Sequence, residues 1–168
     1  MDPIQKVLDE RELLKLADEI ADKAHKGQKR KDGKPYITHP QAVADIISRD
    51  FFELMPQNEA ARANWSAVKN YVIMAGLLHD TIEDTWVTSE YLKNAGMPAM
   101  VVDIVNTVTK RPGENYFDFT MRIVESGNVG AKIVKLADLR HNMSDLAEGS
   151  MLDKYRFATY VLSYFNHK

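Results

Sequence analysis

The sequence predicts an all-α fold, a single helical bundle of roughly seven or eight helices. Apolar residues recur at steps of three and four along most of the chain, and glycines and prolines divide it into segments of helical length. No run of alternating polar and apolar residues predicts a strand. Because 168 residues match the usual size of one domain, we expect residues 1–168 to form a single domain.

The first predicted helix covers residues 4–24, where apolar side chains have the spacing of an amphipathic helix. Asp2 and Pro3 suit its cap and its first position, and Gly27 ends it. The next residues, 28–37, include glycine and proline among basic side chains. That composition predicts a loop.

Pro40 suits the first turn of a second helix, which we expect over residues 41–52. A third helical pattern covers residues 59–85. Its segment 71–78 is apolar on all sides, which is typical of a helix at the centre of a domain. We therefore expect this segment to form the core.

The remaining helices are expected over residues 88–95, 98–110, 116–126, 129–146 and 152–165. Glycine or a Pro-Gly pair follows the first three of them. The last helix carries more aromatic residues than one narrow stripe needs: Tyr155, Phe157, Tyr160, Tyr164 and Phe165. We expect them to pack in the core, with a subunit contact in a homo-oligomer as the alternative.

Composition excludes several classes of protein. The absence of cysteine excludes a disulfide framework, a thiolate zinc site, a cysteine nucleophile and an iron–sulfur cluster. The net charge of −2 argues against a general nucleic-acid-binding protein, because such proteins carry basic fields. The longest apolar stretch is far shorter than the roughly 20 residues of a membrane span, and the N-terminus lacks the features of a signal peptide. We therefore expect a cytoplasmic protein without a membrane partner.

Four ionisable side chains follow the apolar segment: His79, Asp80, Glu83 and Asp84. On a continuous helix His79 lies over Glu83 and Asp80 over Asp84, so the four form one polar patch. Acids are disfavoured at a helix C-terminus, and like charges four residues apart repel each other. A divalent cation held by the adjacent His and Asp side chains would resolve this conflict. The alternative is a helix end with surface acids in solvent.

A second polar cluster lies within an otherwise apolar predicted helix. Its members fall at i, i+3, i+4 and i+7: Asp138, His141, Asn142 and Asp145. A solvated helix face explains this pattern as well as a binding site does. His39 is a further candidate, either as a ligand or as a structural cap residue, because it stands directly before Pro40 and its position would be fixed.

Five cationic residues lie within nine positions: Lys26, Lys29, Arg30, Lys31 and Lys34. Such a run is typical of a solvated loop. The rest of the chain is slightly acidic, however, so these cations beside His39 would form a local site for polyanions. The Arg30 guanidinium can stack on a base while the lysines contact phosphates.

The order of His39, His79-Asp80 and Asp138 resembles the H…HD…D pattern of the HD superfamily of metal-dependent phosphohydrolases. Four segments resemble, more specifically, the hydrolase domain of the RelA/SpoT family: residues 24–30, 35–40, 77–85 and 135–143. One such segment would be a weak signal of this family, but four of them in this order within a small all-α chain are hard to obtain by chance. The length resembles that of the stand-alone small alarmone hydrolases, of which the metazoan SpoT homologue is one type.

The resemblance implies one divalent metal ion, usually Mn²⁺ in this family, bound by His39, His79, Asp80 and Asp138. It implies that Glu83 and Asp84 are the catalytic acids, which handle the protons of the attacking water and of the leaving 3′ oxygen. It also implies substrate contacts from Lys29, Arg30, Lys31 and Asn142, the last of these to the ribose.

The reaction implied by the resemblance is hydrolysis of the 3′-pyrophosphate of (p)ppGpp to GDP or GTP and pyrophosphate. The segment 109–117 departs from the family, in which this region supplies basic contacts to pyrophosphate. The candidates to replace those contacts are Lys110, Arg111 and Arg122. An HD phosphohydrolase acting on another nucleotide phosphate, such as the 2′-phosphate of NADPH or a nucleoside monophosphate, is therefore the alternative. A non-catalytic nucleotide-binding module would be marked by loss of Glu83 or Asp84, and both are present.

Overall fold

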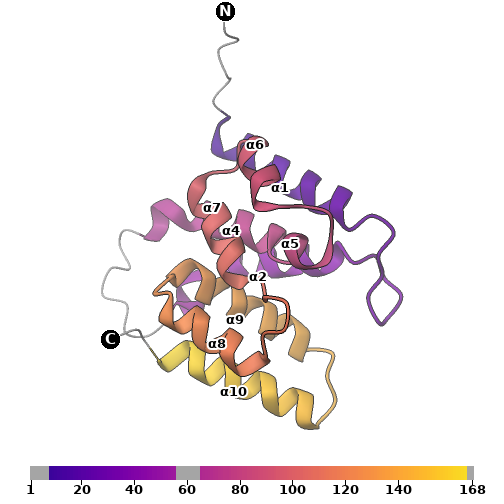
Figure 1. Ribbon diagram of the computed structural model, residues 1–168, viewed down its shortest axis with the longest axis vertical. Coiled ribbons are helices and arrows are strands. Elements are labelled where there is room, and N and C mark those ends of the chain that lie inside the picture. Colours follow the sequence, from indigo (N-terminus) through magenta and orange to yellow (C-terminus); the bar gives the residue numbers. More distant parts are fainter. Residues whose placement is uncertain (1–7, 56–64, 166–168) are drawn as a thin grey trace, which may run out of the picture.

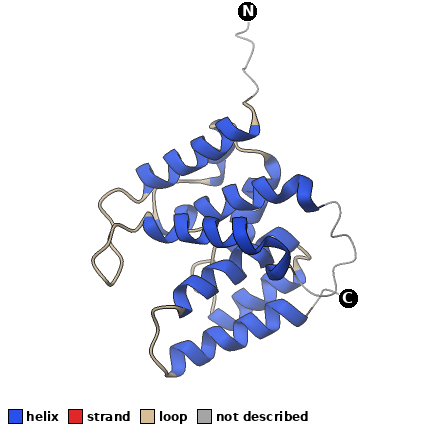
Figure 2. Ribbon diagram, turned by 180° about the vertical axis from the view of Figure 1, so that it is seen from behind, coloured by secondary structure: helices blue, strands red, loops and turns tan. Residues whose placement is uncertain are grey.

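The structure is a computed structural model that describes residues 8–55 and 65–165. Within these two ranges the chain consists of helices and connecting loops and contains no strand (Figures 1 and 2), so the all-α prediction is confirmed. The helices are α1 (Glu10–Ala24), α2 (Thr38–Leu54), the 3₁₀ helix η1 (Ser66–Val68), α4 (Lys69–Leu78), α5 (Thr81–Asp84), α6 (Ser89–Asn94), α7 (Ala99–Val108), α8 (Tyr116–Glu125), α9 (Val129–Met143) and α10 (Ser150–Tyr164).

Helix α1 begins at Glu10 rather than near residue 4, because Asp9 provides a strong start signal. The Asp9 carboxylate accepts a hydrogen bond from the Glu12 backbone N–H at 2.8 Å, and the Glu12 carboxylate accepts one from the Asp9 backbone N–H at 3.0 Å. This reciprocal capping box satisfies two N–H groups that a helix start leaves unpaired. The predicted cap at Asp2-Pro3 lies outside the described residues.

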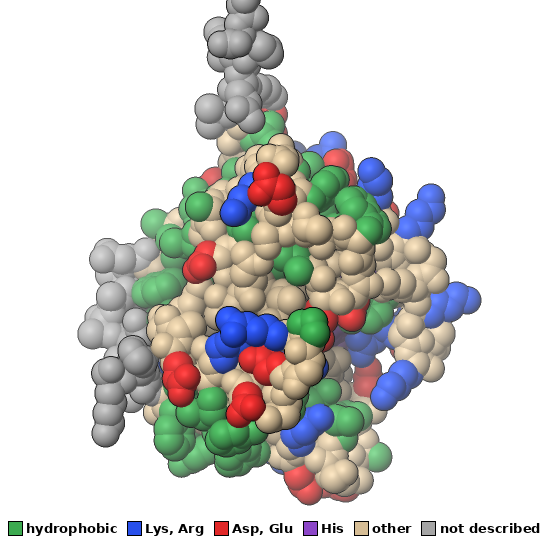
Figure 3. All heavy atoms as spheres, viewed as in Figure 1, with side chains coloured by type: hydrophobic (Ala, Val, Ile, Leu, Met, Phe, Trp, Pro, Cys, Tyr) green, Lys and Arg blue, Asp and Glu red, His purple; other side chains and the backbone are tan. Residues whose placement is uncertain are grey.

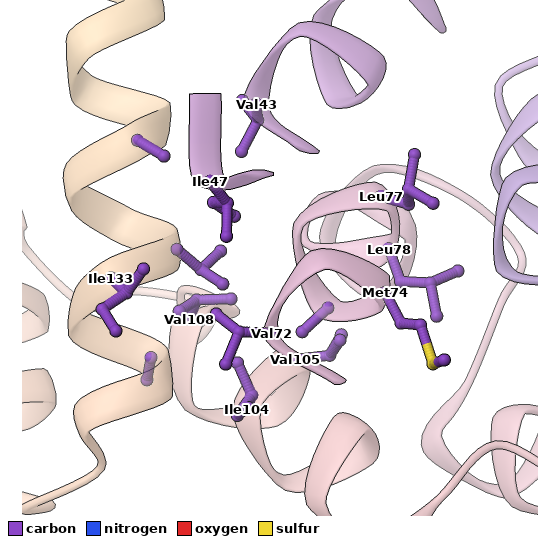
Figure 4. Packing of buried hydrophobic residues seen from close by; sticks show 14 of the residues in the cluster. Val43, Ile47, Val72, Met74, Leu77, Leu78, Ile104, Val105, Val108 and Ile133 are labelled. Atoms are coloured by element: carbon purple, nitrogen blue, oxygen red, sulfur yellow. The ribbon is translucent and has the colours of Figure 1, made fainter. Parts of the chain in front are cut away.

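Helix α4 is the core helix, as predicted. It is buried on several sides through Val72, Met74, Leu77 and Leu78 (Figure 4) and packs against α1, α2, α7 and α9. Gly76 allows the close approach of α2, since a Cβ atom there would stand only 2.6 Å from Cδ1 of Ile47. Helices α8 and α10 lie beyond α9 and contact both it and each other (Figure 1).

The predicted helix over residues 59–85 is divided in the structure. Residues 56–64 lie outside the described ranges, and the described part is interrupted between Leu78, where α4 ends, and Thr81, where α5 begins. Side chains near this break bond carbonyls of α4: Thr81 Oγ1 donates to Leu78 O at 2.7 Å, and His79 Nδ1 contacts Gly76 O at 2.7 Å. Such side-chain bonds to the backbone compete with helix continuation.

The aromatic residues of the last helix were expected in the core, and for four of them this is wrong. Phe157, Tyr160, Tyr164 and Phe165 are each about half exposed. Helix α10 packs on α8 and α9 through one narrow apolar stripe that includes Leu152, Ala158, Val161 and Leu162, so the remaining aromatic side chains face outward. The alternative, a subunit contact, stays a prediction.

No helix in the two described ranges is both long and apolar enough to cross a membrane. The single-domain organisation over residues 1–168 stays a prediction, because both ends of the chain lie outside those ranges.

Candidate metal centre and adjoining pocket

Four side chains that are far apart in the sequence converge at one place inside the bundle. His39 lies in the first turn of α2, His79 and Asp80 lie between α4 and α5, and Asp138 lies on α9. One ligand atom from each of His39, His79 and Asp80 lies within 4.8 Å of the others. Asp138 Oδ1 lies 3.1 Å from His39 Nε2 and 3.7 Å from His79 Nε2. The predicted ligands are therefore brought together.

Both imidazole rings are oriented through their Nδ1 atoms. His79 Nδ1 bonds the Gly76 carbonyl oxygen, and His39 Nδ1 lies 2.7 Å from His141 Nδ1. The other ring nitrogen of His39, Nε2, faces the carboxylates of Asp80 and Asp138. Burial, with the nearby His39 and Arg30, lowers the pKa of His141 and favours its neutral, accepting form. Such a second contact fixes the tautomer of a metal-binding histidine.

Both carboxylates are also held by neighbouring side chains. Tyr36 donates its hydroxyl hydrogen to Asp80 Oδ2 at 2.7 Å. Lys135 Nζ donates to Asp138 Oδ2 at 2.7 Å, and Asn142 Nδ2 donates to Asp138 Oδ1 at 2.6 Å. The sequence pattern does not indicate these roles for Tyr36, His141 or Lys135, although each stands three residues from a predicted ligand.

The electrostatics of this cluster favour a bound cation. Burial by itself would lower the pKa of His79, but Asp80 and Asp138 raise it to about 10. Burial would raise the pKa of Asp80, and the His79 imidazolium lowers it to about 2. His79 Nε2 is buried and makes no hydrogen bond of normal geometry with any described residue. Two imidazole nitrogens and two carboxylates suit a divalent ion such as Mn²⁺, Fe²⁺ or Zn²⁺, so these residues fit a metal centre.

The two predicted catalytic acids lie on α5, next to this cluster, and are exposed. Glu83 accepts a hydrogen bond from the Lys110 backbone N–H at 2.9 Å, which places its carboxylate against the loop after α7. Although Asp84 is exposed as a residue, partial burial of its carboxyl group raises its pKa, and the carboxylates of Asp80 and Glu83 raise it further. Asp84 therefore gives up its proton less readily than an ordinary aspartic acid.

A pocket of about 650 Å³ adjoins the cluster, and its lining includes Lys29, Arg30 and Lys31. Asp32 and Asp145 also line it, and Asp145 lies 3.8 Å from the Arg30 guanidinium. Basic side chains are spread along the projecting loop 28–37, at the right of Figure 3. Tyr36 and Asn142 line the pocket and also bond the carboxylates of the cluster, so the pocket opens beside the candidate metal centre. Its volume lies in the range of small-molecule sites.

Three of the predicted substrate contacts do not line this pocket: Lys110, Arg111 and Arg122. The Arg122 guanidinium is held by the Glu114 carboxylate, at 2.7 Å from Nε, and by the carbonyl oxygens of Thr107 and Thr109. Lys110 lies on the same loop, where its backbone bonds Glu83. The structure therefore gives Arg122 a role in holding the loop 109–115, while its role as a substrate contact stays a prediction.

Comparison with known proteins identifies relatives. A family model described as HD domain matches residues 17–167. A protein of Haemophilus influenzae named guanosine-3′,5′-bis(diphosphate) 3′-pyrophosphohydrolase is 39% identical over 136 residues, which are 76% of this chain and 18% of that protein. The bifunctional (p)ppGpp synthase/hydrolase SpoT of Escherichia coli is 33% identical over 82% of this chain and 18% of its own length. The chain thus spans about a fifth of the length of these relatives.

A solved structure with the same fold is among the matches. It belongs to a metazoan ortholog of SpoT, described as hydrolyzing ppGpp and playing a role in starvation responses, and matches with a TM-score of 0.62. The match covers 90% of this chain and 81% of that chain at 22% sequence identity. At this identity the likeness concerns the arrangement of helices.

Proposed function

Since the chain belongs to the HD-domain family, we propose that it is a metal-dependent phosphohydrolase that removes the 3′-pyrophosphate of (p)ppGpp, releasing GDP or GTP and pyrophosphate. The observation that carries this proposal is the buried cluster of two histidines and two aspartates beside a pocket with a basic wall. The relatives named for this same reaction support the choice of substrate.

His39, His79, Asp80 and Asp138 would hold the metal ion. A mixed set of imidazoles and carboxylates suits Mn²⁺, which we propose as the ion. When bound, the ion would supply Lewis acidity to the scissile phosphate and lower the pKa of a water molecule. The contacts of His39 with His141 and of Asp138 with Lys135 and Asn142 hold the ligand atoms in place before any substrate arrives.

The protein's own groups move the protons. The bond from phosphorus to the 3′ oxygen breaks, a bond from phosphorus to the oxygen of water forms, and the 3′ oxygen gains a proton. Asp84, with its raised pKa, is suited to donate that proton. Glu83, fixed by the Lys110 N–H, is suited to take up the proton that water loses. Arg30, Lys29 and Lys31 would neutralise phosphate charge in the pocket.

The direct test is incubation of the Mn²⁺-loaded protein with ppGpp, followed by measurement of pyrophosphate. We expect release of GDP and pyrophosphate. A sample shown to contain about one equivalent of metal that releases no pyrophosphate would refute the proposal. A parallel panel containing NADPH and nucleoside monophosphates, assayed for phosphate release, identifies a different nucleotide substrate if there is one.

Two variants test the assigned roles. Glu83→Gln should keep the metal and lose turnover by about 10²-fold or more, whereas the control Glu90→Gln, an exposed glutamate on α6, should behave as the unmodified protein. Asp138→Ala should lose the metal, since it removes a ligand. Full activity of Glu83→Gln, or a full equivalent of metal in Asp138→Ala, would remove the respective residue from its role.

A further inference from the structure

We propose that Gln28 and His25 are positioning residues for the hydrolysis, because together they hold the end of α5 that carries Asp84. Gln28 fixes the last carbonyl group of this helix, and His25 orients the Gln28 side chain. This inference rests on the proposed function, and it gives a role to the turn between α1 and the basic loop.

Helix α5 needs contacts from outside to keep its shape. It has only four residues, Thr81–Asp84, and a single helical turn is unstable by itself because few hydrogen bonds offset the cost of ordering its backbone. The Asp84 N–H donates to Asp80 O at 3.0 Å, and the Thr85 N–H donates to Thr81 O at 3.1 Å. The carbonyl groups at a helix C-terminus have no partner inside the helix. The position of Asp84 therefore depends on other parts of the chain.

The Gln28 side chain supplies such a contact. Its Nε2 donates to the Asp84 backbone oxygen at 3.0 Å, across 56 positions of sequence. The Gln28 backbone is also held, because its N–H donates to His25 O at 2.9 Å and its carbonyl oxygen accepts from the Tyr36 N–H at 3.0 Å. Gly27, with a φ of 84°, allows the turn that brings Gln28 back beside His25. The start of the basic loop is thus tied to the helix that carries both proposed catalytic acids.

His25 orients the Gln28 amide group. Only 2% of His25 is exposed, and its Nδ1 lies 2.8 Å from Gln28 Oε1. An amide oxygen can only accept a hydrogen bond, so Nδ1 carries the hydrogen and donates it. This bond leaves the Gln28 amide nitrogen to face the Asp84 carbonyl. The other ring nitrogen, Nε2, is buried and has no hydrogen-bond partner among the described residues, so in that part of the chain the ring directs its hydrogen bonding at Gln28.

The same imidazole contacts a residue that holds a proposed metal ligand. The centres of the His25 and Tyr36 rings are 4.7 Å apart, and the Tyr36 hydroxyl donates to Asp80 Oδ2 at 2.7 Å. Neither His25 nor Gln28 lines the proposed substrate pocket. They therefore act on the rate through Asp84, whose placement matters because a shift of about 1 Å can cost roughly 10²-fold in rate.

The first test measures the kinetics of the Mn²⁺-loaded protein with ppGpp. Gln28→Met keeps the length of the side chain and removes the donor, so it should lower kcat about tenfold. The KM should change by less than about twofold, and the metal content should stay the same. His25→Phe keeps a ring against Tyr36 and should act in the same way. The matched control is Gln41→Met, since Gln41 on α2 donates to Asp18 Oδ1 at 3.0 Å and should not affect kcat.

A double-mutant cycle separates positioning from general damage. In an Asp84→Asn background the acid is already absent, so adding Gln28→Met should lower kcat further by less than about twofold. A merely structural Gln28 predicts the same loss in both backgrounds. That result, full kcat in Gln28→Met, or a loss confined to KM would overturn the inference.

Hydrogen exchange tests the contact without any turnover. Gln28→Met should speed exchange of the Asp84 and Thr85 amide hydrogens about tenfold, because α5 opens more readily, while the amides of α9 should exchange as in the parent protein. Unchanged exchange in α5 would overturn the inference.

The two proposals fail separately. If the parent protein hydrolyses ppGpp and Gln28→Met has the same kcat, the positioning role is wrong and the proposed function stands. If the parent protein instead cleaves another nucleotide of the panel, the substrate assignment is wrong, and the double-mutant cycle with that nucleotide decides the positioning role. A metal-loaded parent protein that cleaves no nucleotide of the panel overturns both.

Discussion

Binding of a divalent ion to the metal-free protein should release about one proton, because His79 holds a proton when no ion is present. Asp80 Oδ2 lies 3.0 Å and Asp138 Oδ1 3.7 Å from His79 Nε2. Burial opposes the charged imidazolium, but these two carboxylates outweigh it and raise the pKa of His79 to about 10. At neutral pH the ring is almost fully protonated, and an ion that binds Nε2 must displace this proton.

The exchange of one proton per bound ion determines how steeply the metal affinity depends on pH. The apparent affinity for Mn²⁺ should rise about tenfold per pH unit between about pH 7 and about pH 9. Calorimetric titration in two buffers that differ in ionisation enthalpy measures the protons released, and repetition at several pH values gives the slope. A release near zero, together with an affinity independent of pH, would refute this account of His79.

The same proton affects stability. The pKa of His79 is about 10 in the folded, metal-free protein and 6.5 ordinarily, so the folded state binds the proton more tightly than the unfolded chain. This contribution is fully present below about pH 6.5 and is lost as the pH rises toward about 10. The Tm of the metal-free protein should therefore fall over this range. Asp80→Asn, which removes the nearer carboxylate partner, should flatten that dependence, and an equally steep fall in the variant would contradict the assignment.

Two further substitutions test the packing and the loop beside the site. Gly76→Ala should lower the free energy of unfolding by about 1 kcal/mol, because the new Cβ would stand 2.6 Å from Ile47 Cδ1 and this overpacking outweighs the gain in helix propensity. Thermal unfolding should show a Tm about 2–4 °C lower. An unchanged Tm would mean that the Ile47 side chain moves aside. Arg122→Met should cost about 2 kcal/mol in urea unfolding, since it removes a charged hydrogen-bond network with Glu114 and two carbonyls, while leaving the metal content unchanged. Stability equal to that of the parent protein would show that the loop 109–115 does not need this network.

Much of the fold follows from local patterns. The apolar segment 71–78 becomes the central helix because a helix that is apolar all round has no face to present to water. Gly96 and Gly127 were predicted to end the helices before them, and in the structure both have a positive φ and lie just after helices. Helix starts were less predictable: the capping box at Asp9 competes with the equally plausible signal at Asp2-Pro3.

The identity of the candidate ligands could also be predicted, but their surroundings could not. Tyr36 bonds a carboxylate 44 positions away, and His39 contacts His141 across 102 positions. Spacing along one helix indicates which side chains share a face, and says nothing about which face meets another helix. For the same reason Arg122, a plausible phosphate contact in the sequence, is instead engaged by Glu114.

The sequence by itself predicted the helical class and the central helix, because periodicity is a local property of the chain. The four side chains that we propose as metal ligands followed from its resemblance to the HD superfamily. Only the tertiary structure decided the break between α4 and α5, the outward-facing aromatic residues of α10, and the partners that orient the ligands. These depend on which surfaces pack together. That choice is made by burial and by hydrogen bonding between residues that are distant in the sequence.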